Sequence, residues 1–251
     1  MPTATLNFYA LIIGTEILNR RRTDAHFNFV SKALADKGHT LTGSFIIEDD
    51  PALIVKTIQF IASQPHAILF SFGGIGSTPD DYTRKCAASA LCDGKMVVHE
   101  EAKSIIEEKL GENAYPHPIK MANLPQGASL LYNPVNQMPA FSLDEQFYFM
   151  PGFPEMSHPM VTDVLSILIP NKQKIYRQTL TAKCKENIFI DIMQQMPQEL
   201  EYSSLPKLIN NAWQVSISVS SDNQILTQEA FDKYTELLKE KNIPYTLTDE
   251  A

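Results

Sequence analysis

The chain has 251 residues, 44% apolar and 20% charged, an ordinary balance for one large globular domain or a medium domain with a small partner. Its net charge of −8 argues against a nucleic-acid-binding protein, because phosphate contacts require clustered lysine and arginine. The three cysteines form no CxxC pair, so we expect reduced thiols in a cytoplasmic protein. The N-terminal stretch MPTATLNFYALIIG has no basic leader and only a short apolar run, which predicts neither a signal peptide nor a membrane span.

The first part of the chain alternates predicted strands and helices. A continuous apolar run at residues 8–13 predicts a strand that is buried on both faces. The elements that follow it are a helix at 24–38, a strand at 40–47, a helix at 50–63, a strand at 67–70 and a helix from Thr78. This order is typical of a parallel sheet built from βαβ units. Ligands of such sheets bind beyond the carboxyl ends of the strands, where we expect the segments after each strand to meet.

The rest of the chain predicts the end of this domain and a second, smaller one. A boundary near Pro170 separates a domain of residues 1–170 from a small α+β domain of residues 171–251. The elements predicted before the boundary are a helix at 100–110, short strands at 128–132 and 146–150, and a helix ending near 169. Those predicted after it are strands at 174–183 and 213–220 and helices at 186–196 and 228–241. Val215, Ile217 and Val219 alternate with polar residues, which indicates a half-buried strand.

The stretch FGGIGSTPDDYT, residues 72–83, follows a predicted strand and admits two interpretations. Glycines let backbone N–H groups approach a phosphate closely, and a helix N-terminus after them would add its dipole. Thr78-Pro79-Asp80-Asp81 is equally typical of a plain helix start, with threonine as the cap. Two carboxylates beside a phosphate would repel it unless a divalent cation such as Mg²⁺ or Mn²⁺ bridges them. We therefore predict an anion cradle with a metal, in which Asp80 and Asp81 contribute ligands.

Other candidates follow the first two strands. Asp50 precedes a proline and is predicted to cap a helix, whereas Asp49 is free to face a ligand. Glu16 is either a solvated surface residue or part of the binding edge. His26 is either a surface histidine or, near the basic run 20–22, an anion contact. The aromatic-rich segment 141–153 is interpreted as core.

Four ordered motifs stand out along the chain: GTEIL at 14–18, GGIGSTPDDYT at 73–83, LPQGA with LYNP at 124–134, and PGFPEM at 151–156. Together they resemble the molybdopterin-binding domain family, and most closely the N-terminal domain of CinA-type competence/damage-inducible proteins and their stand-alone relatives. The resemblance covers about residues 5–170, and CinA-type proteins also carry a small α+β domain after it. Full-length CinA proteins continue into a deamidase domain, and we expect this chain to be a stand-alone form that lacks it.

The resemblance implies a three-layer α/β sandwich with a mostly parallel sheet, as in MogA-like proteins, that binds a pterin or a nucleotide pyrophosphate. In molybdenum-cofactor members, acids at the positions of Asp49 and Asp81 support metal-dependent adenylyl transfer. In CinA-like members the same pocket is associated with metal-dependent cleavage of ADP-ribose, and related domains hydrolyse FAD. Two departures are Phe72, where molybdenum-cofactor enzymes favour Thr or Ser, and Ser77, where Pro is commoner. Losing that Thr or Ser weakens the case for molybdopterin adenylylation.

We therefore expect a metal-dependent nucleotide pyrophosphatase. The alternatives are molybdopterin adenylylation and a non-catalytic module that binds a pterin or nucleotide. The expected catalytic residues are Asp49 and Asp81, and the metal ligands for Mg²⁺, Mn²⁺ or Co²⁺ are Asp49, Asp80 and Asp81. The expected ligand-binding residues are Gly14, Thr15, Glu16, Arg22, His26, Gly73, Gly74, Ile75, Gly76, Ser77 and Thr78. We also expect a homo-oligomer, dimer or trimer, that binds neither nucleic acid nor membrane.

Overall fold

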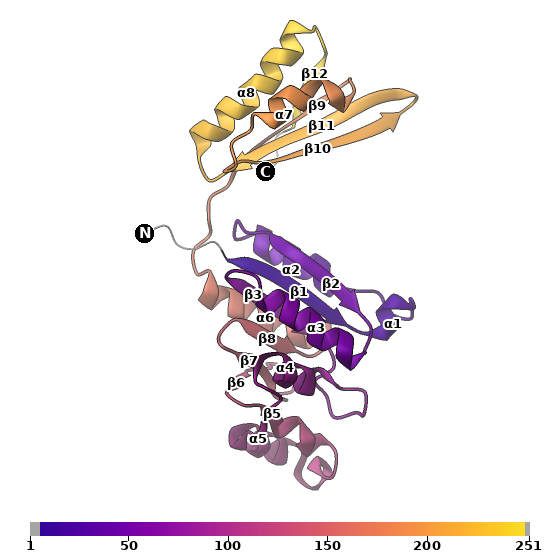
Figure 1. Cartoon of the computed structure of the whole chain (residues 1–251), viewed down its shortest axis with the longest axis vertical. Coiled ribbons are helices and arrows are strands. Elements are labelled where there is room, and N and C mark those ends of the chain that lie inside the picture. The colour runs from indigo at the N-terminus through magenta and orange to yellow at the C-terminus, as the bar shows by residue number, and fades with distance from the viewer. Residues whose placement is uncertain (1–5, 249–251) are drawn as a thin grey trace. The chain divides into compact units, whose positions relative to one another are not determined.

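The computed structural model of the chain describes residues 6–248 and divides the chain into two units between Lys172 and Gln173. A six-stranded sheet in the order β2-β1-β3-β8-β7-β6 forms the centre of the first unit (Figure 1). Its strands are β1 (Asn7–Ile13), β2 (Leu41–Ile47), β3 (Ala67–Phe72), β6 (Ser129–Leu131), β7 (Ala140–Leu143) and β8 (Phe147–Met150). The first four strands in this order pair in parallel. Strand β7 pairs antiparallel with β8, and β6 pairs antiparallel with β7.

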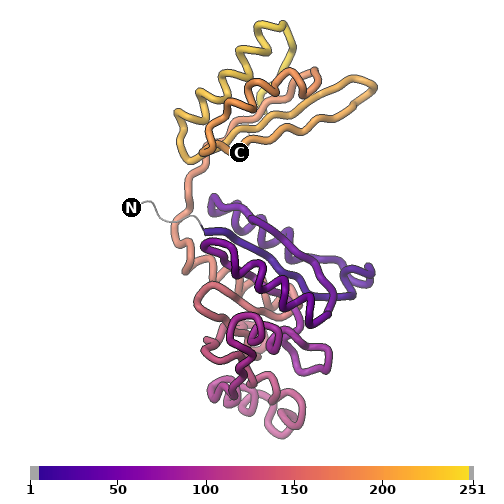
Figure 2. Tube along the Cα trace, in the orientation of Figure 1, coloured from indigo at the N-terminus to yellow at the C-terminus, as the bar shows by residue number. Residues whose placement is uncertain are grey.

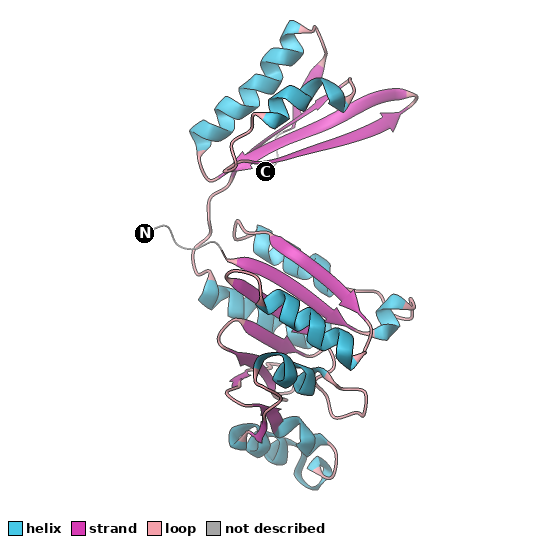
Figure 3. Ribbon diagram, in the orientation of Figure 1, coloured by secondary structure: helices cyan, strands magenta, loops and turns pink. Residues whose placement is uncertain are grey.

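Helices cover both faces of this sheet. Helices α3 and α4 pack together on one face, and α2 packs against α6 on the other (Figure 3). The helices of the unit are α1 (Thr15–Leu18), α2 (His26–Ala35), α3 (Pro51–Ala62), α4 (Thr83–Leu91), α5 (Glu100–Leu110) and α6 (Pro154–Leu168). Two short 3₁₀ helices, η1 (Gly111–Ala114) and η2 (Pro118–Ala122), and an antiparallel pair of strands, β4 (Met96–Val98) with β5 (Asn123–Pro125), complete it. The predicted three-layer α/β class with a mostly parallel sheet is confirmed.

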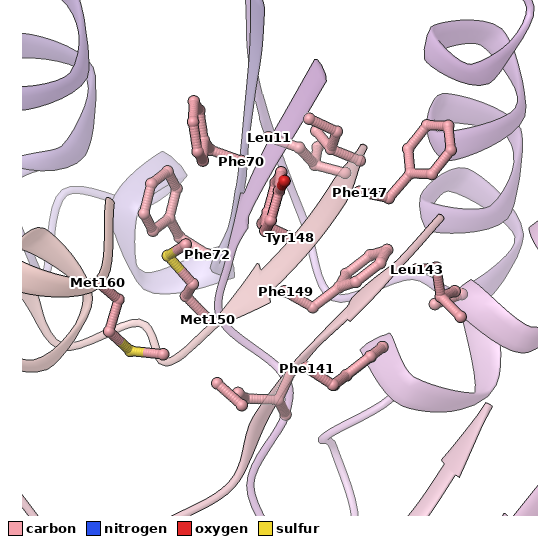
Figure 4. Close-up of a cluster of buried hydrophobic side chains, with 14 of the residues drawn as sticks. Leu11, Phe70, Phe72, Phe141, Leu143, Phe147, Tyr148, Phe149, Met150 and Met160 are labelled. Carbon is pink, nitrogen blue, oxygen red and sulfur yellow. The ribbon is translucent and has the colours of Figure 1, made fainter. Parts of the chain in front are cut away.

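An aromatic core fixes the central strands in place. Rings from β3, β7 and β8 meet there, and Phe141 stacks on Phe149 with 4.7 Å between ring centroids (Figure 4). The interpretation of this aromatic segment as core holds for its strand residues, which are buried. Phe153, just beyond β8, is different because 52% of its surface is exposed. Burial of β1, β3 and β8 fixes their carboxyl ends and thereby the loops that follow them.

The start of α3 shows the predicted cap. The carboxylate of Asp50 accepts a hydrogen bond from the backbone N–H of Leu53 at 2.7 Å, and Pro51 occupies the first helical position. We expect Asp50→Ala to lower the free energy of unfolding by about 1 kcal/mol, because an N–H at the helix end loses its acceptor. Asp50→Ser, which keeps a capping oxygen, should lie near the wild type in the same urea titration. Equal losses in both variants would contradict a capping role.

The second unit is an antiparallel sheet with helices, which confirms the α+β prediction. Its strand order is β10-β11-β9-β12, and β10 and β11 form a long hairpin (Figure 2). The elements are β9 (Tyr176–Ala182), η3 (Glu186–Phe189), α7 (Ile190–Gln194), β10 (Glu201–Ile209), β11 (Ala212–Ser221), α8 (Gln224–Glu240) and β12 (Tyr245–Thr248). Val215, Ile217 and Val219 are buried in a separate small core, as their alternation predicts. No helix within residues 6–248 is long and apolar enough to span a membrane.

Candidate functional site

A pocket of about 500 Å³ opens in the first unit where the four parallel strands end. The loops after β1, β2, β3 and β8 all contribute to its wall. The predicted site residues that line it are Glu16, Arg22, His26, Asp49, Gly73, Gly74, Ile75, Gly76, Ser77, Thr78, Asp80 and Asp81. Gly14 and Thr15 do not line it. The parallel strands thus bring residues from distant parts of the sequence to one place.

The glycines after β3 are required by close packing. Gly73 and Gly74 have φ angles of +100° and +68°, which residues other than glycine rarely adopt. A Cβ atom on Gly73 would lie 2.4 Å from the carbonyl oxygen of Ile13. A Cβ atom on Gly74 would lie 2.3 Å from Oγ1 of Thr83, which donates a hydrogen bond to Gly73 O at 2.9 Å. The loop is therefore held against the end of β1 and the start of α4.

Four consecutive backbone donors in this loop have no protein acceptor. Within residues 6–248, the N–H groups of residues 74–77 make no hydrogen bond. Behind the loop, Nη1 of the buried Arg84 donates to the carbonyl oxygens of Ile75 and Gly76. In a trans peptide the C=O of one residue and the N–H of the next point in opposite directions, so the N–H groups of Gly76 and Ser77 point away from Arg84. Free N–H groups along a pocket wall form a concave site for an anion.

The segment after the glycines is a turn, and the expectation of a helix from Thr78 is wrong. Helix α4 begins at Thr83, five residues later. The N–H and Oγ1 of Thr78 lie 2.7 and 2.6 Å from Oδ2 of Asp81, and Oγ1 also lies 2.6 Å from Oδ1 of Asp80. A helix cap would use the threonine oxygen as an acceptor for a later N–H, whereas this hydroxyl donates to carboxylates. The hydrogen bond from Thr78 lowers the pKa of Asp80.

Thr15 does not line the pocket, but it orients Asp49, which does. The N–H and Oγ1 of Thr15 both donate to Oδ2 of Asp49 at 2.8 Å, and Asp49 N–H donates back to Thr15 Oγ1 at 3.1 Å. Gly14 N–H donates to Ile47 O at 3.0 Å and ties the ends of β1 and β2 together. One oxygen of Asp49, Oδ1, has no hydrogen-bond partner among residues 6–248.

His26 and Arg22 play different parts at the pocket. His26 is 3% exposed, stacks on Phe72 at 4.3 Å between centroids, and has Nε2 at 3.3 Å from Gly152 O. Burial lowers the pKa of His26 to about 4, so its imidazole is neutral near pH 7 and brings no positive charge. The guanidinium of Arg22 lies 5.4 Å from the ring centroid of Phe153 and supplies the positive charge on the lining.

The lowered pKa of His26 predicts acid sensitivity. Unfolded chains bind a proton at this histidine below about pH 6.5, whereas the folded protein does so only near pH 4, so acid favours unfolding. We expect the associated loss of unfolding free energy to begin below pH 6.5 and to approach about 3 kcal/mol below pH 4. His26→Phe should flatten this dependence in urea titrations from pH 7 to pH 4. The exposed His117→Gln is the matched control, and an equal flattening there would contradict the assignment.

A second wall of the pocket was missed by sequence reasoning. Its residues, which come from η2, the loop before β7, and the start of α6, are Met121, Asn133, Asn136, Met138, Pro139, Pro151, Gly152, Phe153 and Met156. Asn133 lies in one of the motifs that carry the family resemblance, and Pro151, Gly152, Phe153 and Met156 lie in another, which was the available signal. Met121 and Met138 lie outside these motifs and carried no such signal.

The carboxylates of the pocket do not form a complete metal site by themselves. Among residues 6–248, no group of three or more His, Cys, Asp or Glu side chains is arranged to hold a metal ion. Glu16, Asp49, Asp80 and Asp81 nevertheless line the same pocket. Any cation bound there would need ligands from another molecule.

Comparison with known proteins agrees with this architecture. A family model described as "Probable molybdopterin binding domain" matches residues 9–171. A putative competence-damage inducible protein of Bacillus pumilus (strain SAFR-032) is 33% identical over 169 residues, which are 64% of this chain and 40% of that protein. A CinA-like protein of Geotalea uraniireducens (strain Rf4) is 29% identical over 191 residues, 73% of this chain and 44% of that protein. The chain thus spans less than half the length of these two relatives.

A protein of Archaeoglobus fulgidus is similar over its full length, with 25% identity across 239 residues that cover 94% of this chain and 100% of that protein. Among solved structures, a CinA protein of unknown function from Thermoplasma acidophilum superposes with a TM-score of 0.59 and 24% identity over 65% of this chain and 99% of that chain. This last likeness concerns the fold. Together, the family match and these relatives show that the chain belongs to the molybdopterin-binding domain family, as a CinA-like member.

Proposed function

We propose that this pocket binds a nucleotide pyrophosphate and hydrolyses it with the help of a divalent metal ion. The observation that carries the proposal is the row of four unpartnered N–H groups at residues 74–77, in a loop that lines the same pocket as Asp49 and Asp81. Backbone N–H groups in such a row suit the oxygens of a diphosphate. Asp49 and Asp81 suit the metal and the attacking water.

The charges of the pocket require a cation if the ligand is a polyanion. Four carboxylates, from Glu16, Asp49, Asp80 and Asp81, line it together with the single positive charge of Arg22. Oγ1 of Thr78 also lies 2.6 Å from both Oδ1 of Asp80 and Oδ2 of Asp81, and its one proton can be donated to only one of these carboxylates at a time. A divalent cation would relieve both conflicts.

The residues present fit such an ion. Oδ1 of Asp49 and Oδ1 of Asp81 make no hydrogen bond within the described chain, so neither is engaged by a protein donor, and both residues line the pocket. Mg²⁺ is usually held by one or two carboxylates, with waters and substrate phosphates as its other ligands, which agrees with the lack of a three-residue cluster. When bound, the ion would lower the pKa of a water and neutralise charge on the leaving phosphate.

In the proposed reaction, the water oxygen attacks one phosphorus of the diphosphate, and the bond from that phosphorus to the bridging oxygen breaks. The bridging oxygen leaves with the second phosphate. A carboxylate of Asp49 or Asp81 accepts the proton that the water loses. The N–H groups of residues 74–77 orient the phosphate oxygens throughout. From ADP-ribose the products are AMP and ribose 5-phosphate.

Family membership also supports a pterin as ligand, so adenylylation of molybdopterin is the second candidate. Phe72 bears on this choice, because it stands where molybdenum-cofactor enzymes favour a hydroxyl residue. It is fully buried and stacks on His26, so no hydroxyl is presented to a ligand at this point. This observation favours hydrolysis over adenylyl transfer.

An activity panel tests the proposal. The purified protein is incubated with ADP-ribose, FAD, NADH or ATP and with Mg²⁺, Mn²⁺, Co²⁺ or a chelator, and AMP is measured. We expect AMP from at least one of ADP-ribose, FAD and NADH, and only when metal is present. Thermal stabilisation by these ligands without any turnover would instead favour a binding module. Formation of adenylylated pterin from ATP and molybdopterin would favour the second candidate.

A further inference from the structure

The second wall of the pocket is largely apolar and has one exposed aromatic ring. Phe153 lies between β8 and α6 with 52% of its surface exposed, while the aromatic residues of β7 and β8 are buried. Met121, Met138 and Met156 line the same pocket. Thioethers and an exposed ring provide a polarizable surface that suits the face of a planar group. The guanidinium of Arg22, 5.4 Å from the centre of the Phe153 ring, restrains that ring.

One polar group in this wall has a fixed orientation and an NH₂ group whose only acceptor within residues 6–248 is a thioether sulfur. Oδ1 of Asn136 accepts hydrogen bonds from the backbone N–H of Met138 at 3.0 Å and from Nδ2 of Asn133 at 2.7 Å. A backbone N–H can only donate, so the oxygen of this amide must face Met138, and its NH₂ group faces the other way. There its contact is the thioether sulfur of Met156 at 3.8 Å, a weak acceptor. The Asn136 NH₂ is therefore available to a ligand.

We infer that Phe153 and Asn136 form a subsite for a planar heteroaromatic ring with a hydrogen-bond acceptor on its edge. The ring stacks on Phe153, and the Asn136 NH₂ donates to a ring nitrogen or carbonyl oxygen. Nucleobases and pterins share this chemistry. The inference rests on the proposed function in one respect only: the ring belongs to the same ligand whose phosphates would bind the N–H groups of residues 74–77.

Binding measurements separate the ring from the phosphates. Calorimetric titrations with Mg²⁺ use AMP, ribose 5-phosphate, pyrophosphate, adenosine and neopterin as probes. We expect the ring-bearing AMP to bind about 10-fold more tightly than ribose 5-phosphate. Adenosine and neopterin distinguish a nucleobase from a pterin as the preferred ring. A wild-type protein that binds AMP and ribose 5-phosphate equally, and neither adenosine nor neopterin, would overturn the subsite.

Two variants test the named residues. Phe153→Leu should remove most of the preference for the ring and leave pyrophosphate binding unchanged. Phe60 is also 52% exposed, and Phe60→Leu is the control that should change neither the preference for the ring nor pyrophosphate binding. Asn136→Asp keeps the acceptor for Met138 N–H and removes the donor. The affinity ratio of AMP to ribose 5-phosphate should fall about 10-fold, and because each probe carries one monophosphate, this ratio cancels the effect of the added charge on the phosphate.

The outcomes distinguish this inference from the proposed function. If the protein binds pyrophosphate and Phe153→Leu leaves the preference for the ring intact, the subsite is overturned and the proposed function stands. If the protein binds adenosine or neopterin but not pyrophosphate, and Phe153→Leu weakens that binding, the subsite is supported and the proposed function is overturned. If no probe binds, both are overturned.

Discussion

Asp81→Asn is expected to lower metal-dependent release of AMP from ADP-ribose by at least about 100-fold. The substitution removes the negative charge that would hold the cation. It retains an oxygen that can accept the hydrogen bonds that Thr78 N–H and Oγ1 now give to Asp81 Oδ2, so the turn keeps its shape. The loss should therefore appear in turnover, while the midpoint of thermal unfolding stays near that of the wild type. Initial rates over a series of Mn²⁺ concentrations measure it.

Asp163→Asn is the matched control for this prediction. Asp163 is exposed on α6, away from the residues that line the pocket, so the same chemical change should leave the rate unaltered. A partial recovery of the Asp81→Asn rate at high Mn²⁺ would indicate weakened metal binding. Unchanged turnover in Asp81→Asn would contradict the assignment of this carboxylate.

Gly73→Ala should have the largest effect on stability. The alanine Cβ would lie 2.4 Å from the carbonyl oxygen of Ile13, a backbone atom of β1 that cannot move aside cheaply, and the φ of +100° adds strain. We expect a loss of about 3 kcal/mol or more in the free energy of unfolding. Stabilisation of the protein by a phosphate ligand should be lost as well, because the loop must shift. Urea titration and ligand-induced thermal shift measure the two effects.

Gly94→Ala separates backbone strain from the clash. Gly94 has a comparable positive φ of +73°, but a Cβ there would meet no atom within 4 Å. It should cost about 1 kcal/mol and leave ligand binding intact. If both variants lose the same stability, close packing of Gly73 against β1 is not what makes this glycine necessary.

Sequence patterns predicted the framework of the site because its signals are local. The apolar run that became β1, the capping residue Asp50, and the glycines after β3 each depend on a few adjacent residues. Parallel strands then bring their carboxyl ends to one edge, so Asp49 and Asp81 could be expected in one pocket without coordinates.

Other features depend on contacts between distant residues. Thr78 was misread because a threonine before proline and two acids looks the same whether its oxygen accepts from a helix or donates to the acids. Burial of His26 depends on Phe72 and Gly152, and the methionine wall joins segments far apart in the chain. Strand β10 was missed because it is an edge strand with exposed residues and contains Pro206.

The most direct measurement of the central claim is the affinity of methylenediphosphonate, a diphosphate that the protein cannot cleave, with Mg²⁺ and with a chelator. Carboxylates and amide donors that line one pocket should bind it at least about 10-fold more tightly when the cation is present than in its absence. Asp81→Asn should abolish that difference. Equal affinity of the wild-type protein with and without Mg²⁺ would contradict the account.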